Sequence, residues 1–277
     1  MSDHAAPPPL SPPLSPALFG LTEGDWLPVT SGESGALVFR DAGATRYAKC
    51  VPAADVAELA AERDRVAWFG GRDLSGPRVL DWCRTDAGAC LLTSAVPGVP
   101  ADQVSAAELR AAWESIADAV RRLHAVPVAE CPFRRGLDGV VAVARDVVSR
   151  DAVNPDFLPE EQRHTPAPEL LARLTGQLAL RREQEAADTV VSHGDLCLPN
   201  ILLDPRTLDV SGFVDLGRLG LADRHADLAL LLTNARETWP DEERARAADA
   251  EFAGRYGTPL DHDRLRFYLH LDPLTWG

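Results

Sequence analysis

The feature of the sequence that most constrains the fold is a short stretch of strand-like pattern between regions of helical pattern. Residues 189–192 are mostly β-branched, and His193-Gly194-Asp195 follows them directly. Two further apolar runs, 201–203 and 210–214, lie on either side of a turn that begins at Asp204-Pro205, and they predict a hairpin. The pattern therefore predicts a small β-structure that ends in polar residues and is surrounded by helices.

Three polar side chains are expected at the ends of these strands: Asp195, Asn200 and Asp215. Carboxylate and amide oxygens are ligands that Mg²⁺ prefers, and a separate carboxylate can orient an attacking hydroxyl and accept its proton. The spacing fits the patterns H-x-D-x-x-x-x-N and D-F-G of kinases, with Asp215-Leu216-Gly217 in the second place. The ordered set predicts phosphoryl transfer, with Asp195 as the catalytic base and the other two as magnesium ligands. Each residue taken alone is as compatible with a turn or a cap.

Lys49 is the only lysine in the chain, so the 28 lysine and arginine residues include 27 arginines. A sequence with this bias is expected to keep a lysine where a compact ammonium is needed, for example between phosphates. Lys49 lies on a predicted strand, 47–51, and Glu62 lies on the apolar face of a predicted helix, 54–69. Because a buried unpaired acid is costly, we expect Glu62 to have a cationic partner. The alternative is an exposed Glu62 at the edge of the helix.

By pattern, the chain divides into a tail and two lobes. Residues 1–20 include the run Pro7–Pro16 and predict a disordered, proline-rich tail. Residues 21–96 show strand patterns around one helix and predict a small nucleotide-binding lobe. Residues 97–277 are mainly helical, with a capping box at Ser105 and Glu108, and predict the catalytic and substrate-binding lobe. The predicted fold class is α+β.

Composition disfavours several classes of protein. A net charge of −14 disfavours nucleic-acid binding and suits a cationic ligand, although an acidic surface also keeps a protein in solution. No apolar run reaches the roughly 18 residues of a membrane span, and the N-terminal residues lack a signal-peptide pattern. The five cysteines form no C-x-x-C pair, which indicates reduced thiols. We expect a cytoplasmic monomer that binds neither nucleic acid nor membrane.

Residues 190–204 (VVSHGDLCLPNILLD) and the later FVDLGRLGLADRHADLALL resemble the aminoglycoside phosphotransferase family, over about residues 26–277. The resemblance implies a two-lobed protein-kinase-like fold, with ATP and Mg²⁺ as cofactors. Within that family, GESGALVFR, VVSRDAVNPDFLPEE and FYLHLDPLTWG are similar to streptomycin 3''-phosphotransferases. These segments lie outside the shared catalytic motifs. They imply that streptomycin is the substrate, that its 3'' hydroxyl is the acceptor, and that the antibiotic is inactivated.

The resemblance also implies roles in nucleotide binding. Lys49, paired with Glu62, would contact the ATP phosphates, and the backbone of Ser94 and Val96 would bind the adenine. The loop that covers the phosphates has two glycines instead of a full G-x-G-x-x-G, and it would use Ser31, Gly32, Ser34 and Gly35.

Two more residues are candidates for substrate contacts. Arg218 follows the Asp215 motif and would face the substrate or the phosphates, with a surface ion pair to Asp223 or Asp227 as the alternative. Streptomycin carries guanidinium groups, which pair strongly with carboxylates. Asp272, near the C-terminus, would bind them, and its alternative role is that of a turn residue before Pro273.

Other functions remain compatible with the motifs. The same fold could phosphorylate another aminoglycoside, homoserine or choline, or it could be a silent kinase-like binding protein. The second alternative is disfavoured because Lys49, Asp195, Asn200 and Asp215 are all present. A protein kinase is disfavoured because HGD replaces HRD and no A-P-E follows. A P-loop enzyme is disfavoured because no G-x-x-x-x-G-K occurs.

Overall fold

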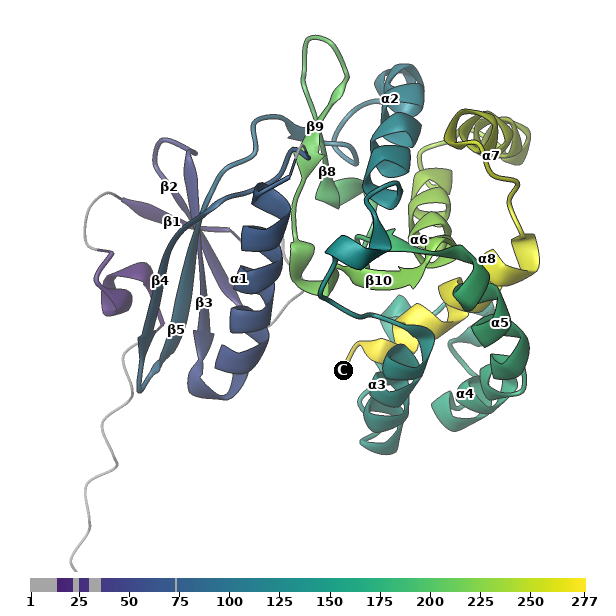
Figure 1. Cartoon of the computed structure of the whole chain (residues 1–277), viewed down its shortest axis with the longest axis horizontal. Helices are drawn as coiled ribbons and strands as arrows, with labels where there is room; N and C mark the ends of the chain where they lie inside the picture. Colours follow the sequence, from purple (N-terminus) through teal and green to yellow (C-terminus); the bar gives the residue numbers. More distant parts are fainter. Residues whose placement is uncertain (1–13, 22–24, 30–35, 73) are drawn as a thin grey trace, which may run out of the picture. The chain divides into compact units, whose positions relative to one another are not determined.

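The computed structural model of the chain describes residues 14–21, 25–29, 36–72 and 74–277 (Figure 1). The chain forms two compact units, one with residues 1–67 and 77–95 and the other with residues 68–76 and 96–277. The break after residue 95 lies next to the sequence-based boundary at 96. Residues 68–76 fall in the second unit, because Trp68 and Phe69 pack edge-on against Phe133 and Phe213 there.

The first unit is built on a five-stranded antiparallel sheet with the strand order β1-β2-β3-β5-β4. A short 3₁₀ turn, η2 (Ala53–Asp55), leads from the middle strand into the helix α1 (Val56–Gly70). The strand predicted around Lys49 and the helix predicted around Glu62 are both present, within two residues of the expected bounds. The strands are β1 (Trp26–Val29), β2 (Leu37–Asp41), β3 (Arg46–Pro52), β4 (Val79–Thr85) and β5 (Gly88–Ser94).

The two faces of this sheet carry different cores. Val51 and Leu91 pack with Leu59 of α1 on one face. Because successive strand residues point to opposite faces, Lys49 shares the α1 face with Val51. Cys50 and its cross-strand partner Cys90 lie on the other face.

The second face of the sheet is covered by a segment that the sequence placed in the disordered tail. Residues Pro16–Phe19 form a 3₁₀ turn, η1, and Phe19 is only 5% exposed. Phe19, Leu14 and Leu21 pack in one cluster with Cys50 and Cys90. The prediction of disorder to residue 20 was therefore wrong for 14–20, because these apolar residues bury against the sheet. Residues 1–13 lie outside the described residues.

The second unit is mainly helical, as predicted, and its first long helix, α2, begins with the predicted capping box. The Ser105 Oγ accepts from the Glu108 amide, and the Glu108 carboxylate accepts from the Ser105 amide. Trp113 on α2 is fully buried and packs against Trp239 and Phe252. The helices are α2 (Ala106–His124), α3 (Leu137–Ser149), α4 (Ala167–Thr175), α5 (Leu178–Asp188), α6 (Arg224–Arg236), α7 (Glu242–Tyr256) and α8 (His262–Leu271).

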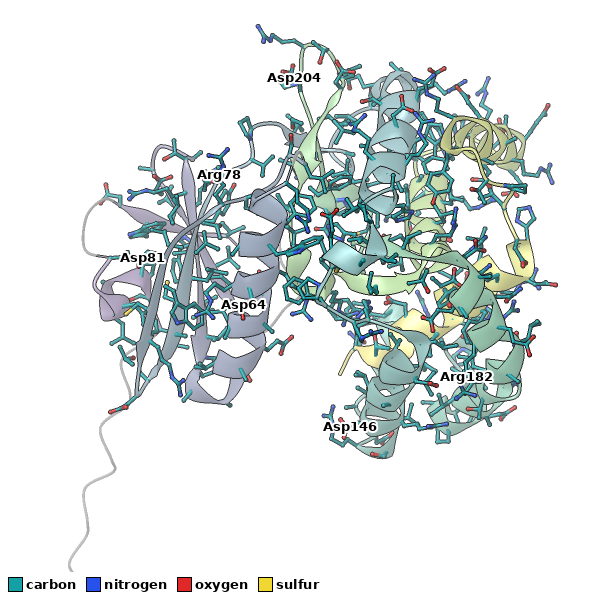
Figure 2. All side chains as sticks on the ribbon, in the orientation of Figure 1. Asp64, Arg78, Asp81, Asp146, Arg182 and Asp204 are labelled. Carbon is teal, nitrogen blue, oxygen red and sulfur yellow. The ribbon has the colours of Figure 1, made fainter. Side chains whose placement is uncertain are left out.

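Two small antiparallel sheets lie among these helices (Figure 1). The predicted hairpin is present as β8 (Ile201–Leu203) and β9 (Val210–Phe213), with β6 (Val99–Pro100) on its edge. The turn at Asp204 projects from the end of the hairpin (Figure 2). The predicted strand β7 (Thr189–Ser192) pairs with β10 (Gly220–Asp223), which the sequence pattern did not reveal. In the described part of the chain, no helix is both long and apolar enough to cross a membrane.

Candidate active site

The loop that carries Asp195 begins where β7 ends, and it turns at Gly194. This glycine has φ of 83°, a conformation that residues with a side chain rarely adopt. A Cβ atom at this position would lie 2.2 Å from the carbonyl oxygen of Arg218. Only glycine therefore fits, and the predicted His193-Gly194-Asp195 motif has a steric cause in addition to a chemical one.

A buried carboxylate on α6, that of Asp227, holds this loop in place. It accepts hydrogen bonds from the Ser192 hydroxyl at 2.8 Å, the His193 amide at 2.7 Å and the Gly194 amide at 2.8 Å. Burial alone would raise the pKa of Asp227, but hydrogen bonds from His124 and Gly194 hold it below its usual range. From the sequence, Asp227 is expected only as an alternative partner of Arg218. Its position in the apolar run ADLALLL could have indicated a buried carboxylate with several hydrogen-bond donors.

The Asp227 carboxylate is supported from the far side by α2 and α7. The His124 Nε2 atom lies 3.0 Å from Asp227 Oδ2, and His124 Nδ1 lies 2.7 Å from the Tyr256 hydroxyl. An ionised carboxylate only accepts, so Nε2 carries the proton that His124 donates. Burial raises the pKa of Tyr256 to about 12. The Asp195 loop is thus linked by buried hydrogen bonds to two long helices.

Asp195 and Asn200 contact each other at the end of the loop. The Asn200 amide nitrogen donates to the Asp195 backbone carbonyl at 2.8 Å and to its carboxylate at 3.2 Å. This orientation leaves the amide oxygen of Asn200 as the atom that a cation would take. Burial raises the pKa of Asp195; the charge of His193 opposes the rise and that of Asp272 adds to it.

Asp215 follows β9 and begins the 3₁₀ turn η7 (Leu216–Arg218). Its φ of 56° is uncommon for a residue other than glycine, and such backbone strain often occurs at functional sites. The Val214 carbonyl lies 2.9 Å from His193 Nε2, which joins this strand end to the Asp195 loop. Asp215 also contributes to the raised pKa of Asp195, so negative charge is concentrated here. One carboxylate and one amide oxygen fit Mg²⁺, which takes one or two protein ligands and completes its shell with water and phosphate.

In the first unit, the predicted ion pair forms between β3 and α1. The Lys49 Nζ atom lies 2.7 Å from Glu62 Oε2, and both side chains are largely buried. Ser94 ends β5, and its hydroxyl accepts from the Arg78 amide at 3.0 Å. Val96, the other residue expected to bind adenine, is the first residue of the segment 96–277, which belongs to the second unit. The four predicted phosphate-loop residues, Ser31, Gly32, Ser34 and Gly35, lie outside the described residues.

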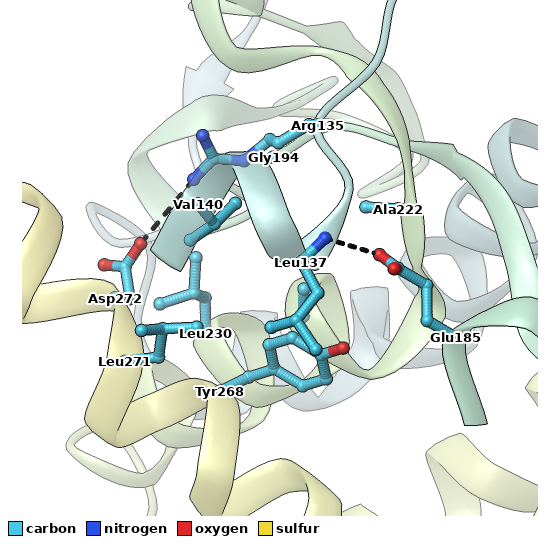
Figure 3. Close-up of a pocket in the computed structure, with 11 residues that line it drawn as sticks. Arg135, Leu137, Val140, Glu185, Gly194, Ala222, Leu230, Tyr268, Leu271 and Asp272 are labelled. Carbon is cyan, nitrogen blue, oxygen red and sulfur yellow. Dashed lines mark hydrogen bonds and ion pairs between the residues drawn. The ribbon is translucent and has the colours of Figure 1, made fainter. Parts of the chain in front are cut away.

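The structure brings together Arg218 and Asp272, which were predicted separately. The Arg218 Nη1 atom lies 3.5 Å from Asp272 Oδ1 and 3.3 Å from the Thr275 hydroxyl. The expected alternative partners, Asp223 and Asp227, are fully buried with other donors. Arg135, which the sequence analysis missed, also reaches Asp272 Oδ1, at 3.8 Å (Figure 3). Nothing in its local sequence, CPFRRG, distinguishes Arg135 from a surface arginine.

A small cavity of about 30 Å³ is lined by Arg135 and Asp272 of this cluster and by Gly194, Glu185 and Tyr268 among others (Figure 3). It is far smaller than the pockets that hold drug-sized ligands. Burial raises the pKa of Glu185, whose carboxylate accepts from the Leu137 amide at 2.8 Å. The cavity by itself is therefore too small to hold a drug-sized ligand.

Comparison with known proteins identifies the family of the chain. The chain matches the model of the phosphotransferase enzyme family (APH) over residues 25–268. It is 73% identical over 277 residues to the streptomycin 3''-kinase of Streptomyces griseus, with all of both chains covered. It is 41% identical over 260 residues to an aminoglycoside 3'-phosphotransferase of Streptomyces fradiae, which covers 90% of this chain and 94% of that protein.

Solved structures give the same result for the fold. The aminoglycoside phosphotransferase APH(3'')-Id of Streptomyces rimosus, in complex with ADP and streptomycin, matches with a TM-score of 0.87 and 66% identity. The match covers 91% of this chain and 93% of that chain. The predicted α+β, protein-kinase-like fold is confirmed, with a β-rich first unit and a mainly helical second unit. The chain therefore belongs to the phosphotransferase enzyme family.

Proposed function

We propose that this chain transfers the γ-phosphoryl group of ATP to a hydroxyl of streptomycin, at the 3'' position. The observation that carries the proposal is the full-length sequence identity of 73% to a streptomycin 3''-kinase. The arrangement of the Asp195 loop supports it, because a buried carboxylate and an adjacent amide follow the pattern of kinases. A bound phosphate adds about −1.5 to −2 charge to the drug and removes a hydroxyl donor, which would inactivate it.

In this proposal, the residues of the site have distinct tasks. Asp195 orients the acceptor hydroxyl and accepts its proton as the new O–P bond forms and the bond to ADP breaks. Asn200 and Asp215 hold Mg²⁺, which supplies charge neutralisation at the phosphates when it is bound. Lys49, fixed by Glu62 at 2.7 Å, binds the phosphates of ATP. The backbone of Ser94 and Val96 binds the adenine. We also propose that the protein acts as a cytoplasmic monomer, which light scattering and cell fractionation would test.

The deciding experiment measures ATP consumption by the purified chain with streptomycin, with kanamycin and without acceptor, and determines the product mass. We expect one added phosphate on streptomycin and NMR shifts at the 3'' position. Turnover of kanamycin alone would contradict the proposal in favour of a 3'-phosphotransferase, the activity named for the 41% identical relative. Binding of ATP and Mg²⁺ without turnover of either drug would point to another small alcohol as the acceptor.

A further inference from the structure

The turn between β2 and β3 is held by the carboxylate of Asp41, the last residue of β2. The Asp41 Oδ1 atom accepts from the Thr45 amide at 2.7 Å and from the Arg46 amide at 3.0 Å. Its Oδ2 atom accepts from the Thr45 hydroxyl at 2.8 Å and from the Arg46 Nε atom at 3.1 Å. Asp41 is only 7% exposed. One buried carboxylate therefore fixes the backbone with which β3 begins.

The backbone of this turn is strained at Ala44, whose φ of 52° is uncommon for a residue with a side chain. Such a conformation persists only where the surrounding contacts enforce it. The Ala44 amide donates to the Asp41 carbonyl at 2.9 Å. Burial alone would raise the pKa of Asp41, but hydrogen bonds from Arg46 and Thr45 hold it well below its usual range. Asp41 thus holds the turn with its backbone and with an ionised side chain.

The Thr45 carbonyl connects this turn to the end of β5, where it accepts from the Ala95 amide at 2.8 Å. The Ala95 amide and the Ser94 carbonyl belong to one planar peptide group. In a trans peptide the N–H and the C=O point in opposite directions. The hydrogen bond to Thr45 therefore directs the Ser94 carbonyl away from β3.

Ser94 is held on its other side by Arg78, which is labelled in Figure 2. The Ser94 amide donates to the Arg78 carbonyl at 2.9 Å, and the Ser94 hydroxyl accepts from the Arg78 amide at 3.0 Å. Ser94 is thus fixed from both sides, and the contacts through Thr45 and Arg78 all lie within the first unit.

We propose that Asp41 is a positioning residue for the nucleotide base: it holds the Thr45 carbonyl, which orients the Ser94 carbonyl to accept from the 6-amino group of adenine. The consequence is specificity, because guanine presents a 6-oxo group, a second acceptor, at the same place. The inference rests on the proposed function, in which the backbone of Ser94 binds the adenine. It adds a residue that does not itself touch the nucleotide.

The direct test measures the binding of two nucleotides, ATP and purine riboside triphosphate, which lacks only the 6-amino group. We expect the wild type to bind ATP about fivefold more tightly, as one hydrogen bond allows. Asp41→Ala should bind the two nucleotides within about twofold of each other. An unchanged ratio in Asp41→Ala would overturn the inference and leave adenine binding by Ser94 intact. Equal binding by the wild type would refute both.

Three further variants show whether the effect belongs to this turn. Asp41→Asn keeps an oxygen for the two backbone amides and should retain most of the ratio. Thr45→Val keeps the backbone carbonyl and should retain it too. The matched control is Asp204→Ala, because Asp204 also holds a hairpin turn, accepting from the amides of Arg206 and Thr207 at 2.8 and 3.2 Å. A comparable loss of the ratio in Asp204→Ala would overturn the inference.

Amide hydrogen exchange without nucleotide separates positioning from a general loss of stability. In Asp41→Ala, the Ala95 amide should exchange at least about fivefold faster, because its acceptor on Thr45 is no longer held. The neighbouring Ser94 amide, bound to Arg78, should change much less. NMR would resolve the two amides. Equal acceleration of both would mean that the variant only unfolds more readily, and would overturn the inference.

Steady-state kinetics with streptomycin completes the test. Asp41→Ala should raise KM for ATP about fivefold and leave kcat and KM for streptomycin within about twofold. A fall in kcat with unchanged KM for ATP would contradict the inference. If the wild type failed to phosphorylate streptomycin while the binding and exchange results held, the proposed function alone would be refuted.

Discussion

At the scale of single residues, the site depends on carboxylates whose surroundings differ sharply. Asp227 is fully buried and accepts four hydrogen bonds, and its pKa lies below the usual range. Asp195 is largely buried; burial raises its pKa, and the charge of His193 opposes that rise. Glu185 is partly buried and accepts from the Leu137 amide, and burial raises its pKa too. The same functional group therefore serves as a support for the loop, as the proposed base and as a structural acceptor.

Asp195→Ala tests the role of the base. We expect turnover to fall by about 10²–10⁴-fold, because a general base typically contributes that much, while ATP binding remains largely intact. Steady-state rates and a nucleotide-binding titration would measure the two effects. Asp204→Asn, at the exposed turn of the hairpin, is the control and should leave turnover unchanged. Turnover near the wild-type rate in Asp195→Ala would refute the assignment.

Glu185→Gln tests the consequence of a raised pKa. An acid with a raised pKa in the folded state binds a proton where the unfolded chain has lost it, so stability falls as pH rises above the ordinary Glu value. Gln can still accept from the Leu137 amide. We expect the Tm of the variant to exceed that of the wild type by about 1–3 °C at pH 7 and to match it near pH 4. A lower Tm at pH 7 would contradict the cause given for the shift.

At the scale of elements, α6 determines how the Asp195 loop is held, and α2 and α7 support α6. The two helices contribute His124 and Tyr256, which meet Asp227 in a line of buried hydrogen bonds. Replacing Asp227, the central acceptor, should lower the free energy of unfolding more than replacing Tyr256 at the end, because several buried donors are then left unpaired.

Asp227→Asn should therefore be more damaging than Tyr256→Phe. Asn presents an amide to donors that need acceptors, so we expect a loss of about 3–5 kcal/mol in the free energy of unfolding and a large fall in kcat. Tyr256→Phe should cost about 1 kcal/mol and leave kcat within about twofold. Denaturant titrations and steady-state kinetics would compare the two variants. Equal effects on kcat would mean that Asp227 does not position the loop.

Local patterns predicted those parts of the site that are close in sequence. The strand around Lys49 and the helix around Glu62 follow from short-range periodicity, and the capping box at Ser105 is local as well. Asp227 and Gly194 are 33 residues apart, and Arg218 and Asp272 are 54 apart. Such pairs depend on how helices pack, which no local pattern contains. The same reason explains why the burial of Phe19 was not predicted. The neighbouring prolines indicate disorder, and the sheet face on which Phe19 packs is formed by residues far along the chain.

At the scale of the whole molecule, each unit has a core of its own. The first unit buries Phe19, Cys50 and Cys90 on one face of its sheet and Leu59 with Val51 on the other. The second unit buries residues such as Leu137, Phe267 and Leu271 between its helices. Because the two cores are separate, we expect a destabilising substitution in one unit to promote unfolding of that unit first.

Phe19→Ala tests whether the N-terminal segment belongs to the first core. Removing a buried aromatic ring typically costs about 3–5 kcal/mol, so we expect a clearly lower Tm. Limited proteolysis should then cut first within residues 36–67 or 77–95. Leu27→Ala, at a side chain on β1 that is 48% exposed, should have little effect. A wild-type Tm for Phe19→Ala would show that residues 16–19 leave the sheet in solution.

The pairing of the only lysine with Glu62 has a practical consequence for labelling. Apart from a terminal amine, the Lys49 amine is the only one in the chain that an acylating reagent can modify. The Lys49 side chain is 21% exposed and lies next to Glu62. Modification of that amine would therefore report directly on one strand of the first unit. If Lys49 binds phosphates, nucleotide should protect it, and intact-mass spectrometry would count occupied molecules without any engineered label.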